Sequence, residues 1–258
     1  MIDLSHKTVL ITGASSGIGA ETACALGKTG ARVVAHHRND ADREGAEHAV
    51  RGVAPARRCL IAADLLHAEA VLRLWDDAVA WAGRIDVVVL NAGIFLEGGV
   101  DDEDAAWDHS WDAQMRVNTL APARLMRRAV RHWQGDGRGG TLITFSSWSG
   151  QRGASNPRHI AYAATKSAVK AVAQSMAAAH AREGVLSYTL TPGIVRTSMS
   201  EQAAALLPGG EASITASLAM REWVPPAEIG ALIAFLATGR ARHLSGATLD
   251  INGASYLR

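Results

Sequence analysis

The chain of 258 residues has little of what stabilises small secreted proteins or inserts proteins into membranes. It contains only two cysteines, Cys24 and Cys59, so disulfide bonds cannot hold the fold together, and we expect a reducing compartment. No run approaches the roughly 18 uncharged apolar residues that a membrane-spanning helix requires. Asp3, His6 and Lys7 interrupt the N-terminal stretch, which is unlike the apolar core of a signal peptide. We therefore expect a cytoplasmic protein that does not enter a membrane.

The sequence also lacks an excess of charge of either sign. It has 26 lysines and arginines against 25 aspartates and glutamates, a net charge of +1. Nucleic acids and anionic membranes attract strongly basic proteins, so this balance predicts neither as a partner. Hydrophobic residues make up 48% of the chain and charged residues 20%, which excludes a disordered protein and is typical of a globular one.

Short apolar runs alternate along the chain with longer amphipathic stretches. Continuous runs such as Val-Val-Val-Leu at residues 87–90 are typical of strands buried on both faces of a parallel sheet. We expect strands at residues 8–12, 32–36, 58–63, 86–90, 141–145, 186–191 and 248–251. We expect helices at residues 18–29, 40–51, 67–81, 110–132, 159–182 and 227–237. This alternation predicts an α/β fold, with a single doubly wound domain over residues 1–258 and a seven-stranded parallel sheet between helices on both faces.

The segment of residues 198–224 fits this alternation least well. It is rich in alanine and is interrupted by Pro208 and two glycines. A long connection of this kind is often a mobile segment over a binding site, so we predict a substrate lid. One or two ordinary helices are the alternative.

Three glycines lie at the junction of the first expected strand and the first expected helix. Glycine lets the backbone turn tightly and approach a phosphate, and the free amides at a helix start attract an anion. The spacing is G-x-x-x-G-x-G rather than the G-x-G-x-x-G of many dinucleotide folds, and a turn without a ligand is the alternative. Its place after the first strand favours a dinucleotide site. The candidate residues are Gly13, Ser15, Ser16, Gly17, Ile18 and Gly19.

The end of the second expected strand indicates which dinucleotide binds. An acidic residue there binds the ribose 2′-hydroxyl of NAD, whereas an arginine accommodates the 2′-phosphate of NADP. This chain has no carboxylate before Asp40, and the guanidinium of Arg38 is well suited to adenine and phosphate. We therefore favour NADP, with NAD as the alternative. The adjacent His36 and His37 have no third ligand at a useful spacing, so we predict no metal site.

Four polar residues suggest acid–base chemistry. Tyr162 and Lys166 are four residues apart in an expected helix and therefore share a face. A nearby ammonium favours the phenolate, so Lys166 is expected to lower the pKa of Tyr162 and make it an acid–base group. Ser147 follows an expected strand at the edge where ligands bind, and its hydroxyl can polarise a carbonyl. Asn118 lies inside an expected helix, where asparagine is mildly unfavourable and needs a reason.

Taken together, these motifs resemble the short-chain dehydrogenase/reductase family over essentially the whole chain. The family's order is kept by Thr-Gly-x-x-x-Gly-x-Gly at 12–19, Asn-Ala-Gly at 91–93, Asn118, Ser147, Tyr-x-x-x-Lys at 162–166 and Pro-Gly-x-x-x-Thr at 192–197. The resemblance implies a Rossmann domain and an NAD(P)-dependent oxidoreductase that transfers a hydride between the nicotinamide and a ketone or secondary alcohol. Members that reduce 3-oxoacyl thioesters or oxidise sugars are similar, and a homotetramer is implied.

The resemblance also assigns roles to individual residues. It implies that Tyr162 is the acid–base and that Lys166 lowers its pKa and binds the nicotinamide ribose. Ser147 would hold the substrate carbonyl, and Asn118 would position a water that links Lys166 to solvent. The remaining implied cofactor contacts are Asp64, Leu65, Asn91, Ala92, Gly93, Pro192, Gly193, Ile194, Val195 and Thr197.

Some features depart from the family's pattern. The serine-to-tyrosine spacing is commonly thirteen but is fifteen between Ser147 and Tyr162, and thirteen residues back lies Ser149. We prefer Ser147, because its spacing to Gly150 is kept and the loop at residues 156–158 can absorb two residues. Ser16 stands where many NADP-binding members have a basic residue, which weakens the preference for NADP. A non-catalytic dinucleotide-binding protein and a lyase or epimerase on the same fold are the alternative functions.

Overall fold

The computed structural model describes residues 2–205 and 207–257, so Met1, Leu206 and Arg258 of the predicted domain and lid lie outside the described residues. A seven-stranded parallel sheet forms the centre, in the order β3-β2-β1-β4-β5-β6-β7. The strands are β1 (Thr8–Ile11), β2 (Arg32–His37), β3 (Arg58–Ala62), β4 (Val87–Leu90), β5 (Thr141–Phe145), β6 (Leu186–Pro192) and β7 (Thr248–Ile251). The predicted fold class and all seven strands are confirmed.

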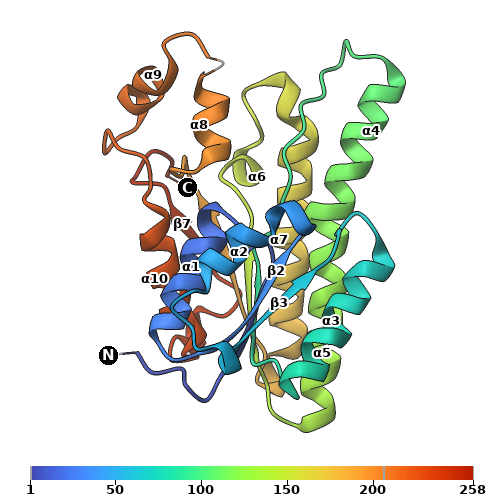
Figure 1. Cartoon of the computed structure of the whole chain (residues 1–258). Coiled ribbons are helices and arrows are strands. Elements are labelled where there is room, and N and C mark those ends of the chain that lie inside the picture. Colours follow the sequence, from blue (N-terminus) through green and yellow to red (C-terminus); the bar gives the residue numbers. More distant parts are fainter. Residues whose placement is uncertain (1, 206, 258) are drawn as a thin grey trace.

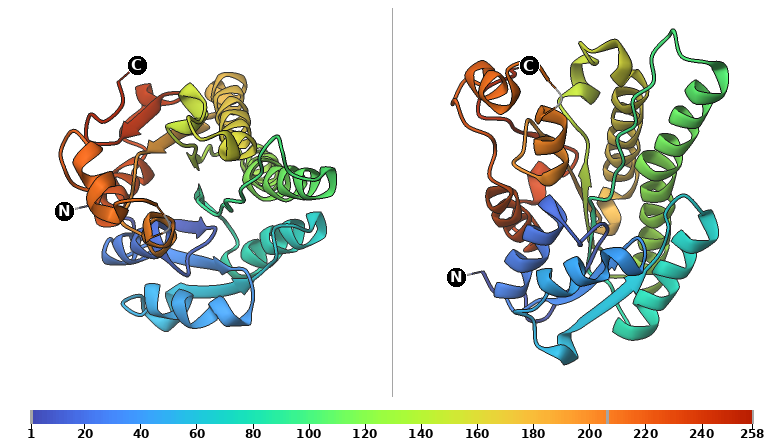
Figure 2. Two further views of the ribbon diagram at one scale, coloured as in Figure 1. Left: turned by 90° about the horizontal axis from the view of Figure 1, so that it is seen from above. Right: turned by 45° about the horizontal axis from the view of Figure 1, so that its top comes forward.

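Helices cover both faces of this sheet (Figure 1). One face carries α1 (Gly17–Lys28), α2 (Arg43–Ala49) and α10 (Pro226–Ala237). The other carries α3 (Ala68–Ala82), α4 (Asp104–Met115), α5 (Ala121–Asp136) and α7 (Ile160–His180). Both views in Figure 2 show these two helical layers with the sheet between them.

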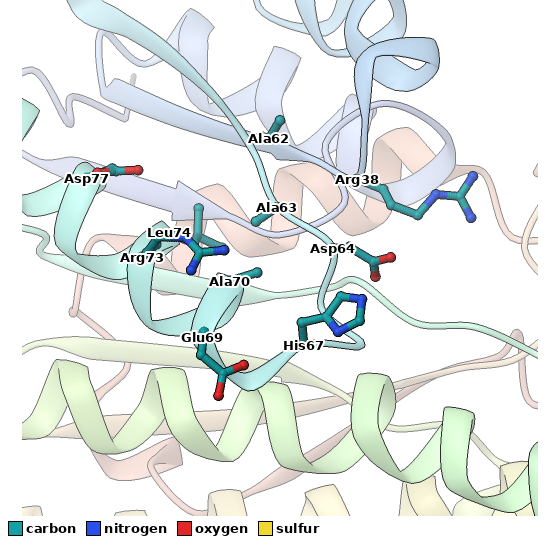
Figure 3. A pocket seen from close by; sticks show the side chains of 10 residues that line it. All are labelled: Arg38, Ala62, Ala63, Asp64, His67, Glu69, Ala70, Arg73, Leu74 and Asp77. Atoms are coloured by element: carbon teal, nitrogen blue, oxygen red, sulfur yellow. The ribbon is translucent and has the colours of Figure 1, made fainter.

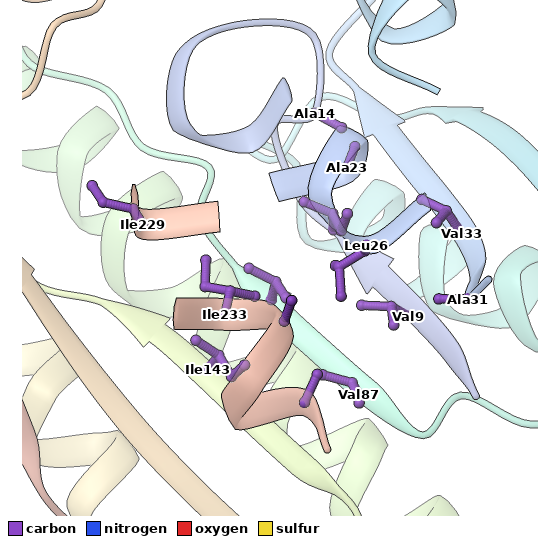
Figure 4. Close-up of a cluster of buried hydrophobic side chains, with 14 of the residues drawn as sticks. Val9, Ala14, Ala23, Leu26, Ala31, Val33, Val87, Ile143, Ile229 and Ile233 are labelled. Carbon is purple, nitrogen blue, oxygen red and sulfur yellow. The ribbon is translucent and has the colours of Figure 1, made fainter. Parts of the chain in front are cut away.

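Each face of the sheet has its own hydrophobic core. In β1, Val9 and Ile11 point into the core beneath α1 and α10, whereas Leu10 points into the core beneath α3, α5 and α7. Figure 4 shows the first of these cores, in which Ile233 of α10 packs with Val87 and Ile143 of the sheet. Burial on both faces explains why these strands read as continuous apolar runs.

The long helix predicted at residues 110–132 differs from the structure in its bounds and its geometry. The helical segment begins at Asp104 and ends at Asp136, and Arg116–Leu120 between α4 and α5 forms a π-helical turn. Such a turn accommodates an extra residue and often occurs at functional sites. It has Asn118 at its centre. The short helix α6 (Ser149–Arg152), which was not predicted, follows β5.

Residues 198–224 contain the short helices α8 (Ser198–Ala205) and α9 (Gly210–Ser217), which lie above the sheet in Figure 1. The two ends of the segment are joined, because Val224 donates to the carbonyl of Ile194 at 2.9 Å and Arg196 donates to that of Val224 at 3.0 Å. Trp223 forms a small core that Trp148 and Ile194 contact. Helices therefore make up much of the predicted lid, whose role as a lid stays a prediction.

None of the helices within the described ranges is both long and apolar enough to cross a membrane.

Candidate active site

The glycine turn joins β1 to α1. Gly13 and Gly17 have positive φ angles of 67° and 52°, and a Cβ at Gly19 would overlap the carbonyl oxygen of Gly13. Helix α1 begins at Gly17, and the side chain of Ser16 before it makes no capping hydrogen bond. The first amides of the helix are therefore left without a side-chain partner, and the turn is narrow enough for close approach. These features fit the phosphates of a dinucleotide.

Of the other predicted turn residues, Ile18 packs its side chain against the core beneath α1 and α10. Ser15 lies in the turn itself, next to Ser16.

Asn91 and Ala92, which follow β4, support this turn directly. The hydroxyl of Thr12 accepts hydrogen bonds from the backbone amides of Asn91 and Ala92, both at 3.0 Å. The Asn91 side chain donates to the carbonyls of Thr12 and Gly13, also at 3.0 Å. Because both of its amide hydrogens are used in this way, Asn91 acts on the site by fixing the backbone of the turn.

A pocket of about 480 Å³ lies between the carboxyl end of β3 and the start of α3 (Figure 3). Arg38 and Asp64, two of the predicted cofactor residues, contribute to its lining. The Arg38 side chain is 61% exposed and lies 3.3 Å from the carboxylate of Asp42. Asp64 accepts a hydrogen bond from the amide of Leu66 at 3.0 Å, and Leu65 is buried. Asp64 therefore caps the turn that leads into α3.

The predicted catalytic pair lies at the start of α7. The ammonium of Lys166 is buried, donates to the carbonyl of Phe145 at 3.1 Å, and lies 5.7 Å from the centre of the Tyr162 ring. Burial raises the pKa of Tyr162 to about 12, and a hydrogen bond with the Ser147 hydroxyl opposes part of this rise. Burial lowers the pKa of Lys166 to about 8.

These pKa shifts correct one expectation from the sequence. The Lys166 ammonium was expected to lower the pKa of Tyr162, but the structure gives a raised pKa. The reason is that burial disfavours the phenolate, and the hydrogen bond with the Ser147 hydroxyl offsets only part of this effect. Tyr162 therefore holds its proton at neutral pH.

Ser147, rather than Ser149, is the serine that meets this tyrosine. Ser147 is 8% exposed, and its hydroxyl bonds to Tyr162 and accepts from the amide of Ser149 at 3.2 Å. Ser149 is the first residue of α6. The loop before α7 is fixed at Arg158, which bonds to Asp102 through both terminal nitrogens at 2.9 and 3.0 Å. Geometry thus favours the assignment that kept the spacing to Gly150.

The side chain of Asn118 makes hydrogen bonds that the sequence did not indicate. It accepts from the amide of Ile94 at 2.8 Å and donates to the carbonyl of the same residue at 2.9 Å. It also donates to the hydroxyl of Thr165 at 3.2 Å. A Cβ placed on Gly93 would lie 3.3 Å from both the Asn118 oxygen and the Lys166 nitrogen. Asn118 and Lys166 therefore flank Gly93.

The segment that leaves β6 returns to the glycine turn. Pro192 ends the strand, and Gly193 donates to the carbonyl of Ile251 at 2.9 Å. The methyl group of Thr197 lies 3.1 Å from where a Cβ on Gly17 would stand. Between Gly193 and Thr197, Ile194 contacts the small core of residues 198–224, and Val195 is buried in the core beneath α1.

Three residues that position the site were not singled out by the sequence. Thr12 was part of a quoted motif only, and His36 was considered only as a metal ligand. Gln114 is fully buried and bonds to both backbone groups of Leu96, at 3.2 and 3.0 Å. The available signal for Gln114 was its position one helical turn before Asn118, which places two amide side chains on one face.

Comparison with known proteins supports the same chemistry. Residues 7–206 match the family model described as short chain dehydrogenase. Versicolorin reductase of Emericella nidulans is 30% identical over 98% of this chain and 97% of its own length. 3β-Hydroxysteroid dehydrogenase 1 of Eggerthella lenta is 30% identical over 99% and 95%, and tetrahydroxynaphthalene reductase of Pyricularia oryzae is 28% identical over 98% and 91%. The chain therefore belongs to the short-chain dehydrogenase/reductase family of oxidoreductases.

Proposed function

We propose that this oxidoreductase prefers NADP(H) and interconverts a ketone and its secondary alcohol, with Tyr162 as the acid–base. The observation that carries the proposal is the contact between the hydroxyls of Tyr162 and Ser147 beside the buried ammonium of Lys166. The three groups lie where the carboxyl ends of parallel strands present ligands.

The protonation states indicate which group donates the proton and which groups stabilise the charge. With a pKa of about 12, Tyr162 carries a proton at neutral pH and can donate it to a carbonyl oxygen as charge develops there. The Ser147 hydroxyl donates a hydrogen bond to the same oxygen. The phenolate that remains is stabilised by the Lys166 ammonium, and in alcohol oxidation Tyr162 accepts the proton instead. The bound dinucleotide supplies or accepts the hydride.

The cofactor assignments extend from the glycine turn to β3. We assign the pyrophosphate to the turn at residues 13–19, the 2′-phosphate to Arg38, and the adenine to Asp64 and Leu65. We assign the nicotinamide and its ribose to Lys166 and to the segment of residues 192–197. Arg38 supports NADP(H), because its exposed guanidinium has only the Asp42 carboxylate as an ion-pair partner among the described residues.

For the substrate we propose a fused-ring ketone or its alcohol, in preference to a 3-oxoacyl thioester or a sugar. The names of two relatives, a hydroxysteroid dehydrogenase and a tetrahydroxynaphthalene reductase, denote fused-ring compounds. Trp148 follows Ser147 and packs with Ile194 against the small core of residues 198–224, so it offers a flat apolar wall beside the reacting group. We propose that α8 and α9 close over that substrate as the lid.

A panel of ketones and alcohols, each tested with both nicotinamide dinucleotides, examines the proposal directly. We expect NADPH-dependent reduction of fused-ring ketones, with slower turnover of 3-oxoacyl thioesters and sugars. Binding of a dinucleotide without turnover of any ketone or alcohol would favour the non-catalytic alternative. Conversion of substrate with no net change in the dinucleotide would favour a lyase or epimerase. We also propose the homotetramer that the family resemblance implies, and light scattering on the same sample tests it.

A further inference from the structure

His36 connects two parts of the proposed cofactor site. It lies in β2 and is 2% exposed. Its Nδ1 accepts a hydrogen bond from the backbone amide of Gly13 at 3.0 Å. Its Nε2 lies 2.8 Å from the carbonyl of Ala63. An amide only donates and a carbonyl only accepts, so the ring is neutral and carries its proton on Nε2. Burial lowers the pKa of His36 to about 4, which keeps it neutral at physiological pH.

The contacts of His36 join the proposed pyrophosphate site to the proposed adenine site. Gly13 opens the glycine turn, and the next amide, that of Ala14, donates to the carbonyl of His36 at 2.8 Å. His36 therefore holds two consecutive amides of the turn, one with its side chain and one with its backbone. On the other side, Ala63 directly precedes Asp64, which is assigned to the adenine.

Gly13 has no side chain to restrict its backbone, so its conformation depends on the contacts of its carbonyl, which Asn91 holds, and of its amide, which His36 holds. Its φ of 67° lies in the left-handed region, where glycine moves freely among several backbone states. Loss of the acceptor at Nδ1 leaves the Gly13 amide without its partner and removes a contact that selects this state. The conformation that presents the helix amides to a pyrophosphate then loses population.

We propose that His36 is a positioning residue for the dinucleotide, acting through the hydrogen bond from the Gly13 amide to its Nδ1. The inference rests on the proposed function, because it takes the glycine turn as the pyrophosphate site. It predicts that the two nitrogens of the ring differ in importance. The Nδ1 contact sets cofactor affinity, and the Nε2 contact with Ala63 orients the ring.

His37 provides a matched control in the next position. It is 1% exposed, so it is as deeply buried as His36. Its Nδ1 bonds to the carbonyl of Asn39 at 2.9 Å, and its Nε2 has no hydrogen-bond partner among the residues that the structure describes. His37 is thus a histidine as deeply buried as His36 that does not touch the glycine turn, and its Nδ1 donates to a carbonyl instead of accepting from an amide.

Two amide substitutions separate the contacts of His36. The oxygen of His36→Asn stands near the position of Nδ1 and can accept from Gly13, whereas the amide of His36→Gln stands near Nε2 and can donate to Ala63. We measure the dissociation constants of NADPH and NADH by calorimetry, together with the melting temperature and the separate kcat and KM values. His37→Asn is the control.

We expect His36→Asn and His37→Asn to bind both dinucleotides within about threefold of the wild type. We expect His36→Gln to bind both about tenfold more weakly or worse, with kcat at saturating dinucleotide nearly unchanged. Wild-type affinity in folded His36→Gln, or equally weak binding by His36→Asn, overturns the inference. Should His36→Gln not fold, His36→Asn alone decides, since weak binding by that folded variant overturns it. If the wild type binds neither dinucleotide, the proposed function itself fails.

Discussion

Asn118 pairs with the backbone of Ile94 as a neighbouring strand would, using its side-chain oxygen and nitrogen for the amide and the carbonyl of the same residue. Gln114, one helical turn earlier, makes the same pair of bonds with Leu96. Two buried amide side chains thus hold alternate residues of the segment that follows Asn-Ala-Gly. Between them, the ring of Phe95 meets that of Tyr162 edge-on at a centroid distance of 5.2 Å. The helical segment with the π turn therefore fixes one wall of the proposed active site.

Substituting Asn118 or Gln114 by alanine tests whether these two side chains, which hold the same loop, differ in function. Each change leaves a partly buried backbone amide and carbonyl without their side-chain partner, so we expect Asn118→Ala and Gln114→Ala each to lower the free energy of unfolding by about 1–3 kcal/mol. Asn118 also flanks Gly93 opposite Lys166, whereas Gln114 contacts Ser110 and Leu96. We therefore expect Asn118→Ala to lower kcat by at least about tenfold more than Gln114→Ala. Urea denaturation and steady-state kinetics provide the two readouts.

Equal losses of kcat in the two variants would show that Asn118 acts only by holding the loop, with no separate effect at Lys166.

The lowered pKa of Lys166 predicts a pH dependence for the free enzyme. The ammonium is present below pH about 8 and is lost as the pH rises through that value. If this ammonium helps to bind the dinucleotide, kcat/KM for the dinucleotide falls above pH about 8, whereas Tyr162 stays protonated until about 12. In Lys166→Arg the charge persists, so we expect a lower kcat/KM that no longer declines in this range. A decline at the same pH in Lys166→Arg would assign it to another group.

Much of the fold follows from local sequence patterns. Continuous apolar runs such as Val87–Leu90 indicate strands buried on both faces, and glycines after β1 mark the turn into α1. The π turn at Arg116–Leu120 has no such pattern, because its sequence, Arg-Val-Asn-Thr-Leu, contains no glycine or proline to mark a change of helix geometry. The first turns of α4 were missed because charged residues such as Asp104 and Asp108 break the apolar pattern there.

The candidate site was likewise predicted in part, and the rest depends on tertiary structure. The order of motifs indicates which residues meet at the sheet edge, since parallel strands end on one side. The pKa of Tyr162 was given the wrong direction, because the sequence shows the neighbouring Lys166 but not the burial of the phenol, which is the main cause of the shift. The hydrogen bond from Gln114 to Leu96 and the contact of His36 with Gly13 depend on tertiary packing, which the spacing of residues along the sequence does not reveal.

Arg38 is expected to determine the choice between the two dinucleotides. Its side chain is 61% exposed, so Arg38→Asp removes the proposed phosphate partner without disturbing the core. We expect the affinity for NADPH to fall about tenfold to a hundredfold and that for NADH to change little or rise. The exposed Arg51, in the turn after α2, serves as the control, because Arg51→Asp makes the same charge change away from the site. An unchanged NADPH-to-NADH ratio in Arg38→Asp would remove Arg38 from the 2′-phosphate site.

The most direct test of the account compares Tyr162→Phe with the wild type in one experiment. Each protein is loaded with NADPH, its affinity is measured by titration, and oxidation of the bound dinucleotide by a ketone substrate is followed in a single turnover. Because only the phenol hydroxyl is removed, the account predicts unchanged NADPH affinity and a rate at least about a hundredfold lower. Oxidation of NADPH at the wild-type rate in Tyr162→Phe would contradict the assignment of the proton donor.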